Sequence, residues 1–175
     1  DRGAIGYPQI NNARGATGIT ASNAVLNGVL VATGGAPATV TVFWGTSDGG
    51  TEAAGWGHTN ELGGGVAGQS FAWPVIVEPG LTYYYRFFAS NLAAEVGWAG
   101  ATARFTAPAS PWVTIGVGAA PVSYSTAGLN GELMAGLSAD LTVLWGADSN
   151  AWANTNGLGT RFEGPFTVQV AGLLP

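Results

Sequence analysis

The 175-residue chain contains no cysteine and no lysine, and charged residues make up only 9% of it. Without cysteine there is no disulfide framework, and the sequence does not reveal the redox compartment. The net charge is −5. Because a nucleic-acid partner requires a basic stripe that neutralises phosphates, the composition excludes DNA and RNA as partners. The five cations are all arginines: Arg2, Arg14, Arg86, Arg104 and Arg161.

Long apolar runs are missing as well. No stretch approaches the ~20 residues that a membrane-spanning helix requires, so we expect no membrane span. The low charge also means weak repulsion between copies, which suits a protein that packs against its neighbours. Disorder is excluded by the 47% of hydrophobic residues and the seven tryptophans. The first residues, Asp1-Arg2-Gly3, include no methionine, which indicates a processed product or an excerpt.

The most informative feature that is present is an internal repeat. The stretch from Leu26-Asn27-Gly28 to Trp44-Gly45 returns as Leu129-Asn130-Gly131 to Trp145-Gly146. The match continues upstream and downstream, where a second tryptophan and a leucine-glycine pair also recur. Self-similarity of this kind predicts a tandem array of structural units.

The repeat also sets the expected domain boundaries. We expect a first unit over residues 1–107, a Pro-rich linker over residues 108–112 and a second unit over residues 113–175. The second copy stops at Pro175, which corresponds to Pro79 of the first copy, so the rest of the first copy has no counterpart. The second unit is therefore expected to lack its last two strands.

Strand signals recur about every ten residues between clusters of Gly, Pro, Asn and Asp, whereas helix signals are nearly missing. The clearest strand is Thr82–Ala89, in which Tyr83, Tyr85 and Phe87 alternate with Tyr84, Arg86 and Phe88. Short strands at this spacing predict an all-β fold of antiparallel sandwiches, with a propeller as the alternative. The expected strands are Pro8–Asn11, Ile19–Leu30, Thr39–Trp44, Gln69–Val77, Thr82–Ser90 and Ala101–Thr106.

The residues of this strand and its turn carry a resemblance to a known family. Val77–Tyr83, with its Pro-Gly corner, and the following Tyr85–Asn91 resemble the sixth-strand region of fibronectin type III domains, in which the tyrosine hydroxyl anchors the corner. More narrowly, Ala24–Gly28, Phe43–Gly50 and Tyr83–Phe87 resemble repeats of large bacterial cell-surface proteins. The resemblance implies tandem fibronectin type III-like sandwiches in an extracellular or cell-surface protein, and it says little about activity.

Few residues are candidates for catalysis. His58 is the only histidine, and its repeat counterpart is Asn154, so we interpret His58 as an ordinary loop residue. Ser47, His58 and Asp48 could be recruited as a nucleophilic triad, but no nucleophile elbow or oxyanion-hole motif accompanies them. We therefore expect no catalytic residue.

Acidic residues of the same region give a second candidate site. Asp48, Glu52 and Glu61 could supply the paired carboxylates of a glycoside hydrolase, but only Asp48 has an acidic counterpart, Asp148. A calcium site near Asp48 is the other alternative, although the regular spacing of calcium loops is missing. The preferred interpretation is a solvated loop, without a cofactor or a metal.

Tryptophans are the residues with the strongest repeat signal. Trp44 recurs as Trp145, so we expect both to anchor the fold of their own unit, together with Tyr83 at its corner. Trp56 recurs as Trp152, and we expect this pair to serve the fold as well. Three other tryptophans have no aromatic counterpart: Trp73, Trp98 and Trp112. They are candidates for an interface with another domain or subunit, with core packing as an equal alternative and glycan stacking as a third.

The missing end of the second unit leaves two explanations. A sandwich without its last strands exposes a sheet edge and apolar core. Either the chain is an excerpt of a longer repetitive protein, or another molecule supplies the strands, as in donor-strand complementation. The head Asp1–Tyr7 could donate one strand at most.

The sequence as a whole favours a non-catalytic structural or adhesive protein of a bacterial extracellular filament or surface fibre. Its expected partners are copies of itself or further repeats of the same polypeptide, with surface glycans as additional candidates. The alternative is a spacer or glycan-binding accessory segment of a secreted multidomain enzyme, which should be monomeric. An enzyme within these residues ranks third.

Overall fold

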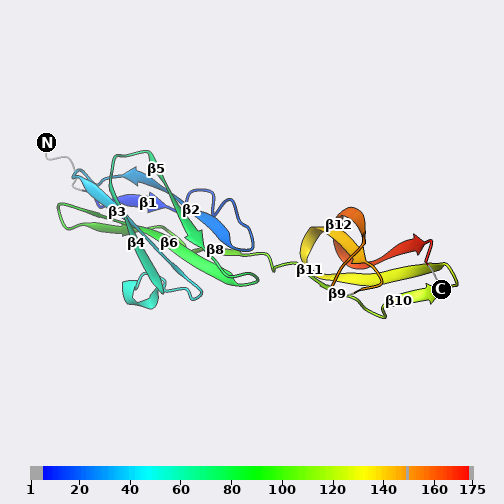
Figure 1. Cartoon of the computed structure of the whole chain (residues 1–175). Helices are drawn as coiled ribbons and strands as arrows, with labels where there is room; N and C mark the ends of the chain where they lie inside the picture. The colour runs from blue at the N-terminus through cyan, green and yellow to red at the C-terminus, as the bar shows by residue number, and fades with distance from the viewer. Residues whose placement is uncertain (1–5, 149, 174–175) are drawn as a thin grey trace. The chain divides into compact units, whose positions relative to one another are not determined.

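The structure is a computed structural model that describes residues 6–148 and 150–173, and its contacts divide the chain into two compact units, Asp1–Pro108 and Ala109–Pro175 (Figure 1). Apart from the short 3-10 turn η1 (Ala53–Gly55), all the regular structure in the described residues is β-strand, and the strands pair antiparallel. The expected all-β fold class is confirmed. The end at Pro175, which the repeat aligns with Pro79, lies outside the described residues, as does most of the head Asp1–Tyr7.

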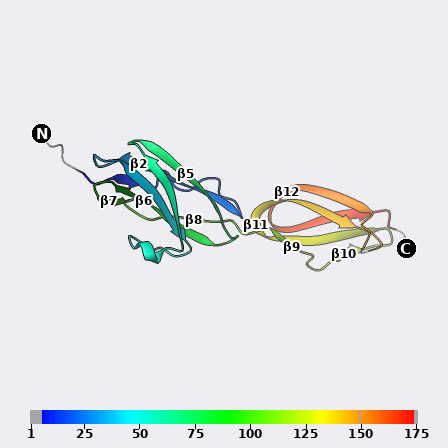
Figure 2. The same cartoon turned by 60° about the vertical axis from the view of Figure 1, so that its left-hand side comes forward.

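Unit 1 contains two sheets, which can be followed in Figures 1 and 2. The first has the order β1-β2-β5, formed by Gln9–Asn11, Asn23–Ala32 and Gln69–Ile76. The second has the order β4-β3-β6-β7, with β8 also paired to β6. Its strands are β3 (Ala38–Gly45), β4 (His58–Gly65), β6 (Thr82–Asn91), β7 (Val96–Trp98) and β8 (Ala103–Thr106).

The core of unit 1 follows from alternation along its strands. In β6 every second side chain, including Tyr85 and Phe87, is buried, and the side chains between them are partly covered. Leu26 of β2 and Val42 of β3 meet them in one hydrophobic cluster. Full burial of such side chains contributes about 1.5–3 kcal/mol each. Because β6 pairs with β3, β7 and β8, it is the strand on which the second sheet depends.

Several element boundaries differ from the sequence prediction. The second expected strand starts at Asn23 rather than Ile19, because the Thr20 hydroxyl accepts hydrogen bonds from the amides that follow it and closes a turn. The last expected strand, Ala101–Thr106, begins only at Ala103, and β7 precedes it. The segment from His58 onward was predicted as a loop, but it forms β4. Its glycines concealed a strand because they carry no alternating side chains.

Unit 2 is built around one long hairpin. β11 (Thr126–Trp145) pairs with β12 (Asn154–Ala171), while β9 (Trp112–Thr114) and β10 (Ala119–Val122) add to the other side of β11. The pairing register shifts between Leu133 and Ser138, and the hairpin curves at this place (Figures 1 and 2).

The curved hairpin brings its two halves onto one small core. Ala127, Val168 and Val170 are buried, and Leu129 from the first half of β11 joins Val143 from its second half beside them. Trp145, Leu158 and Leu173 complete this cluster. The hairpin thus supplies both walls of the core of unit 2.

Candidate interaction site

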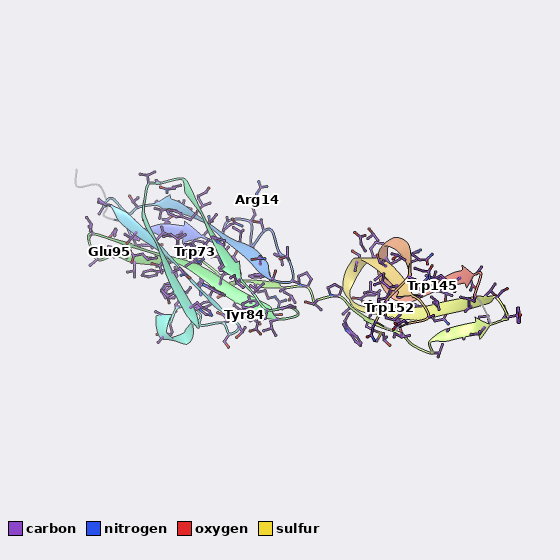
Figure 3. All side chains as sticks on the ribbon, viewed as in Figure 1. Arg14, Trp73, Tyr84, Glu95, Trp145 and Trp152 are labelled. Atoms are coloured by element: carbon purple, nitrogen blue, oxygen red, sulfur yellow. The ribbon has the colours of Figure 1, made fainter. Side chains whose placement is uncertain are left out.

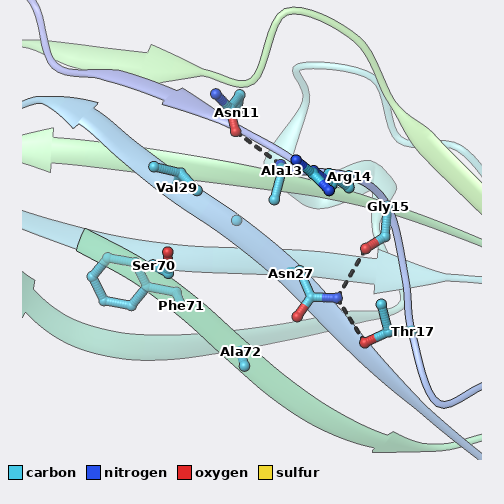
Figure 4. A pocket seen from close by; sticks show the side chains of 11 residues that line it. Asn11, Ala13, Arg14, Gly15, Thr17, Asn27, Val29, Ser70, Phe71 and Ala72 are labelled. Atoms are coloured by element: carbon cyan, nitrogen blue, oxygen red, sulfur yellow. Dashed lines mark hydrogen bonds between the residues drawn. The ribbon is translucent and has the colours of Figure 1, made fainter. Parts of the chain in front are cut away.

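An asparagine holds the same position in both units. The Asn27 side-chain amide donates hydrogen bonds to the Gly15 carbonyl oxygen at 2.9 Å and to the Thr17 hydroxyl at 3.0 Å (Figure 4). The Asn130 amide donates to the carbonyl oxygens of Gly118 at 2.9 Å and Ala120 at 2.8 Å. Each asparagine ties the strand that carries it to the segment before that strand.

The three residues expected to anchor the fold all make buried or half-buried polar contacts. The Trp44 indole N–H donates to the Asn60 side-chain oxygen at 2.8 Å, and the Trp145 indole makes the same contact with Asn156, also at 2.8 Å. The Tyr83 hydroxyl accepts a hydrogen bond from the Glu78 backbone N–H at 2.9 Å. This is the corner contact that the family resemblance implies.

The three candidate interface tryptophans lie in different environments. Trp73, on β5, is half-buried against the core of unit 1 (Figure 3). Trp98 packs within its own unit, where its ring centroid lies 4.9 Å from that of Phe43 and 4.8 Å from that of Phe88. Trp112, at the start of β9, is 53% exposed. Trp112 therefore has the most surface free for contact with another molecule.

The residues weighed for catalysis make separate contacts in the structure. The His58 ring stacks on Trp44 with a centroid distance of 4.1 Å. An Asp48 carboxylate oxygen accepts hydrogen bonds from the Gly50 amide and the Thr102 hydroxyl, which closes a turn. Asp148 likewise accepts the Asn150 amide. Ser47, Glu52 and Glu61 are exposed, and the described residues hold no group of three or more metal-ligating side chains.

A shallow hollow of about 600 Å³ lies in unit 1 between the segment 13–17 and strands β2 and β5 (Figure 4). Arg14 is the one charged side chain of its lining. The Asn27 amide, which could otherwise meet a ligand, is already bonded to Gly15 and Thr17. This hollow offers few free polar groups to a small molecule.

Unit 2 contains a sheet edge that is paired in unit 1. There, β3 lies between β4 and β6 and pairs with both. The corresponding stretch of unit 2, residues 139–145 of β11, pairs with β12 on one side, and no strand in the described parts of the chain pairs with its other side. We call residues 139–145 the open edge. Its unpaired backbone groups are a template for another strand.

An apolar hollow of about 380 Å³ adjoins the open edge. Side chains from both halves of the hairpin and from the β9 region line it, among them Val113, Ile115, Leu129, Val143, Trp145 and Phe166. The half-exposed Trp152 stands at the same hollow (Figure 3). The matching space of unit 1 holds the side chains of β6.

The exposure of matching residues shows which contacts of unit 1 are missing in unit 2. Ile10 of unit 1 is 6% exposed, whereas Val113, which the repeat aligns with it, is 47% exposed. Phe43 is 7% exposed, and its counterpart Leu144 is 50% exposed. In unit 1 these positions are covered by contacts with β6 and β7, including the Phe43–Phe88 and Phe43–Trp98 ring contacts.

A phenylalanine fills part of this space in unit 2. In unit 1 the Phe87 ring of β6 lies directly over Gly28, where an added Cβ would be 2.5 Å from it. Over the matching Gly131 lies the ring of Phe166, where an added Cβ would be 2.4 Å away. Phe166 belongs to β12 and pairs across the hairpin with Gly131. A residue of a different strand thus takes the place of the β6 aromatic ring.

Sequence reasoning expected an exposed edge and an apolar core in the second unit, but it did not single out Phe166 or the hollow. None of the helical residues in the described ranges forms a segment with the length and apolar character of a membrane-spanning helix. No family model and no curated protein matches the chain.

Proposed function

We propose that the chain is a non-catalytic structural or adhesive subunit of a bacterial extracellular filament or surface fibre, with copies of itself or further repeats of the same polypeptide as partners. The observation that carries the proposal is the concentration of exposed apolar side chains on unit 2. More than half of the surface of each of these is exposed: Trp112, Ile115, Val117, Val122, Tyr124, Trp152 and Phe162.

Such a surface favours association between proteins. Monomeric proteins rarely expose large contiguous apolar patches, and exposed aromatic residues are enriched where proteins meet. The low charge of the chain adds little repulsion to oppose such contacts. The well-packed core of unit 1 and the family resemblance both support a structural module.

Electron microscopy of the native material, paired with the intact mass of its subunit, tests the proposal. We expect ordered fibres, and dispersed monomers would contradict the proposal. A matched pair of variants tests the role of unit 2. Trp112→Ser should weaken assembly, whereas Leu92→Ser, at an 83% exposed position of unit 1, should leave it unchanged. Equal effects of the two variants on assembly would show that Trp112 of unit 2 is not part of the contact between subunits.

The alternative, a glycan-binding accessory segment, is favoured by one specific observation. Trp152 is half-exposed beside the apolar hollow, and an exposed indole can stack on a sugar ring. Titration of the chain with soluble polysaccharides, followed by tryptophan fluorescence, tests this function. Binding by a monomeric chain that Trp152→Ala abolishes would favour the alternative over the filament.

A further inference from the structure

We infer that the shallow hollow of unit 1 binds a sugar that carries a carboxylate, such as one uronic-acid unit of an acidic polysaccharide. The free polar groups of this hollow are few, but they are of three complementary kinds: a cation, a hydroxyl and an oxygen acceptor. The inference goes beyond the proposed function, because fibres could assemble with or without a sugar at this place. All of the residues that carry it belong to unit 1.

A tight turn presents the cation of the hollow (Figure 4). The Gly15 amide donates to the Asn12 carbonyl oxygen at 3.0 Å, and the Ala13 amide donates to the Asn11 side-chain oxygen at 2.8 Å. Ala13 has a φ of 47°, in the left-handed region that a residue other than glycine adopts at a cost. Arg14 follows it, exposed, and no acidic side chain in the described ranges pairs with it. Its guanidinium is therefore free to bind a carboxylate through two parallel hydrogen bonds.

The Asn27 side chain supplies the acceptor. Its amide donates to Gly15, Thr17 and the Val25 carbonyl oxygen, whereas its oxygen accepts no hydrogen bond from the part of the chain that the structure describes. In Figure 4 this oxygen lies on the side of the group that faces away from Gly15 and Thr17. Asn27 is half-buried, so a ligand hydroxyl that donates to the oxygen would satisfy a polar atom that has lost part of its water.

In unit 2 the matching oxygen already has a donor within the protein. The Asn130 side-chain oxygen accepts a hydrogen bond from the Thr167 hydroxyl at 2.7 Å. The strand pairs Asn27–Ala72 and Asn130–Thr167 place Ala72 of unit 1 at the position of Thr167. Because Ala72 has no hydroxyl, the acceptor of unit 1 stays open.

The other lining positions change in the same direction. The repeat and the strand registers align three more of them, and the replacements in unit 2 are Val117 for Arg14, Pro165 for Ser70 and Glu132 for Val29. Unit 2 therefore has neither the cation nor the serine hydroxyl at this place, and it adds an acid that would repel a carboxylate. The two units share the asparagine, so these groups are not a requirement of the fold.

The floor of the hollow fits a sugar better than a peptide. Short side chains form it, among them Val29, Ser70 and Ala72, and the space of about 600 Å³ above them is wide and shallow. Such a floor gives a peptide side chain little to insert into, whereas the C–H face of a sugar ring can lie flat on it. Ring hydroxyls can donate to Asn27 and exchange hydrogen bonds with Ser70. A carboxylate on the same ring is the group that Arg14 selects.

A titration of the full chain with a galacturonic-acid tetramer, followed by nuclear magnetic resonance, tests the inference. The signals of residues 13–17 and of the Asn27 side-chain amide should shift. The methyl-esterified tetramer keeps the hydroxyls but has no charge, and it should bind at least roughly tenfold more weakly. Arg14→Gln should cause a loss of the same size for the acid form. Arg104→Gln, at an exposed arginine of β8, is the matched control and should leave binding unchanged.

Two substitutions of Ala72 test the contact with the Asn27 oxygen. Ala72→Thr gives unit 1 the threonine of unit 2, whose hydroxyl should occupy this oxygen and weaken binding by roughly fivefold, although Arg14 is still present. Ala72→Val has nearly the same shape without the hydroxyl and should weaken binding less than roughly twofold. Both residues are favoured in strands, and Ala72 is exposed, so both variants should fold.

The inference is overturned if the acid and ester forms bind alike, if Arg14→Gln leaves binding unchanged, or if Ala72→Thr and Ala72→Val weaken it equally. Absence of any binding at millimolar tetramer overturns it too, and so does binding that requires Trp152 of unit 2. A glutamate tetramer that binds the hollow as tightly as the sugar would assign it to an acidic peptide instead. These outcomes do not depend on fibre formation, so the inference and the proposed function fail separately.

Discussion

Gly28 and Gly131 occupy matching positions in the two units, but different strands cover them. In unit 1 the cover is Phe87, a fully buried residue of a central strand of the opposite sheet. In unit 2 it is Phe166, a half-buried residue of the neighbouring strand. The central strand therefore covers this position with a fully buried ring in unit 1, whereas the cross-strand ring in unit 2 is only half-buried.

The polar contacts differ far less between the units than the apolar ones. Trp44 and Trp145 donate to asparagine oxygens at the same distance of 2.8 Å. Asn27 and Asn130 each tie a strand to the segment before it. These contacts are made among strands that both units possess. These hydrogen bonds therefore form without a β6 strand, whereas close packing of the apolar core requires one.

The largest difference should appear when the covering rings are removed. Phe87→Ala should destabilise unit 1 by about 3–5 kcal/mol, because it leaves a cavity in a fully buried core. Phe166→Ala should destabilise unit 2 by only about 1 kcal/mol, because its ring is partly in water already. Calorimetric unfolding of the full chain measures both, and equal losses would show that the two cores are equally closed.

Overpacking the two glycines should give a smaller difference in the same direction. Gly28→Ala should cost unit 1 about 2–3 kcal/mol, because Phe87 is enclosed and cannot move away from the new methyl group. Gly131→Ala should cost less than Gly28→Ala, because Phe166 is only half-buried, although the added methyl group would also lie 3.0 Å from the Thr114 carbonyl oxygen. Urea midpoints compare the variants, and a greater cost at Gly131 would contradict an open hollow.

Alkaline pH should affect unit 1 and spare unit 2. Burial raises the pKa of the Tyr85 hydroxyl to about 12, above its ordinary value of 10.0. The unfolded chain loses this proton first, so stability is fully present below pH ~10 and falls by about 2 kcal/mol as the pH rises to ~12. The one tyrosine of unit 2, Tyr124, is exposed. Thermal unfolding from pH 9 to 12 checks this, with Tyr85→Phe as the variant that should remove the difference.

The smallest effects should be equal in the two units. Asn27→Ala and Asn130→Ala each remove hydrogen bonds to the preceding segment, and each should cost about 1 kcal/mol. Equal losses of stability are the informative result, because they would show that these hydrogen bonds contribute alike in both units although the apolar cores differ. A markedly larger loss at Asn130 would mean that unit 2 relies on this frame to offset its open hollow.

Much of the fold could be predicted because alternation and repetition depend only on the order of residue types along the chain. The alternation in β6 and the recurrence of Trp44 as Trp145 both follow from side-chain type alone. β4 escaped prediction because His58–Gly65 carries too few apolar side chains to alternate. The apolar hollow of unit 2 escaped prediction because it depends on the position of the Phe166 ring, which only the tertiary structure determines.

Hydrogen exchange of the native chain, with β3 (Ala38–Gly45) compared with residues 139–145, tests the difference between the units most directly. Because β3 is paired on both sides, its amides should be protected throughout. Along residues 139–145 alternate amides should exchange rapidly, since these amides point away from β12 and meet no strand among the described residues. Equal protection of the two stretches would mean that the edge is already covered, and it would refute an open edge in unit 2.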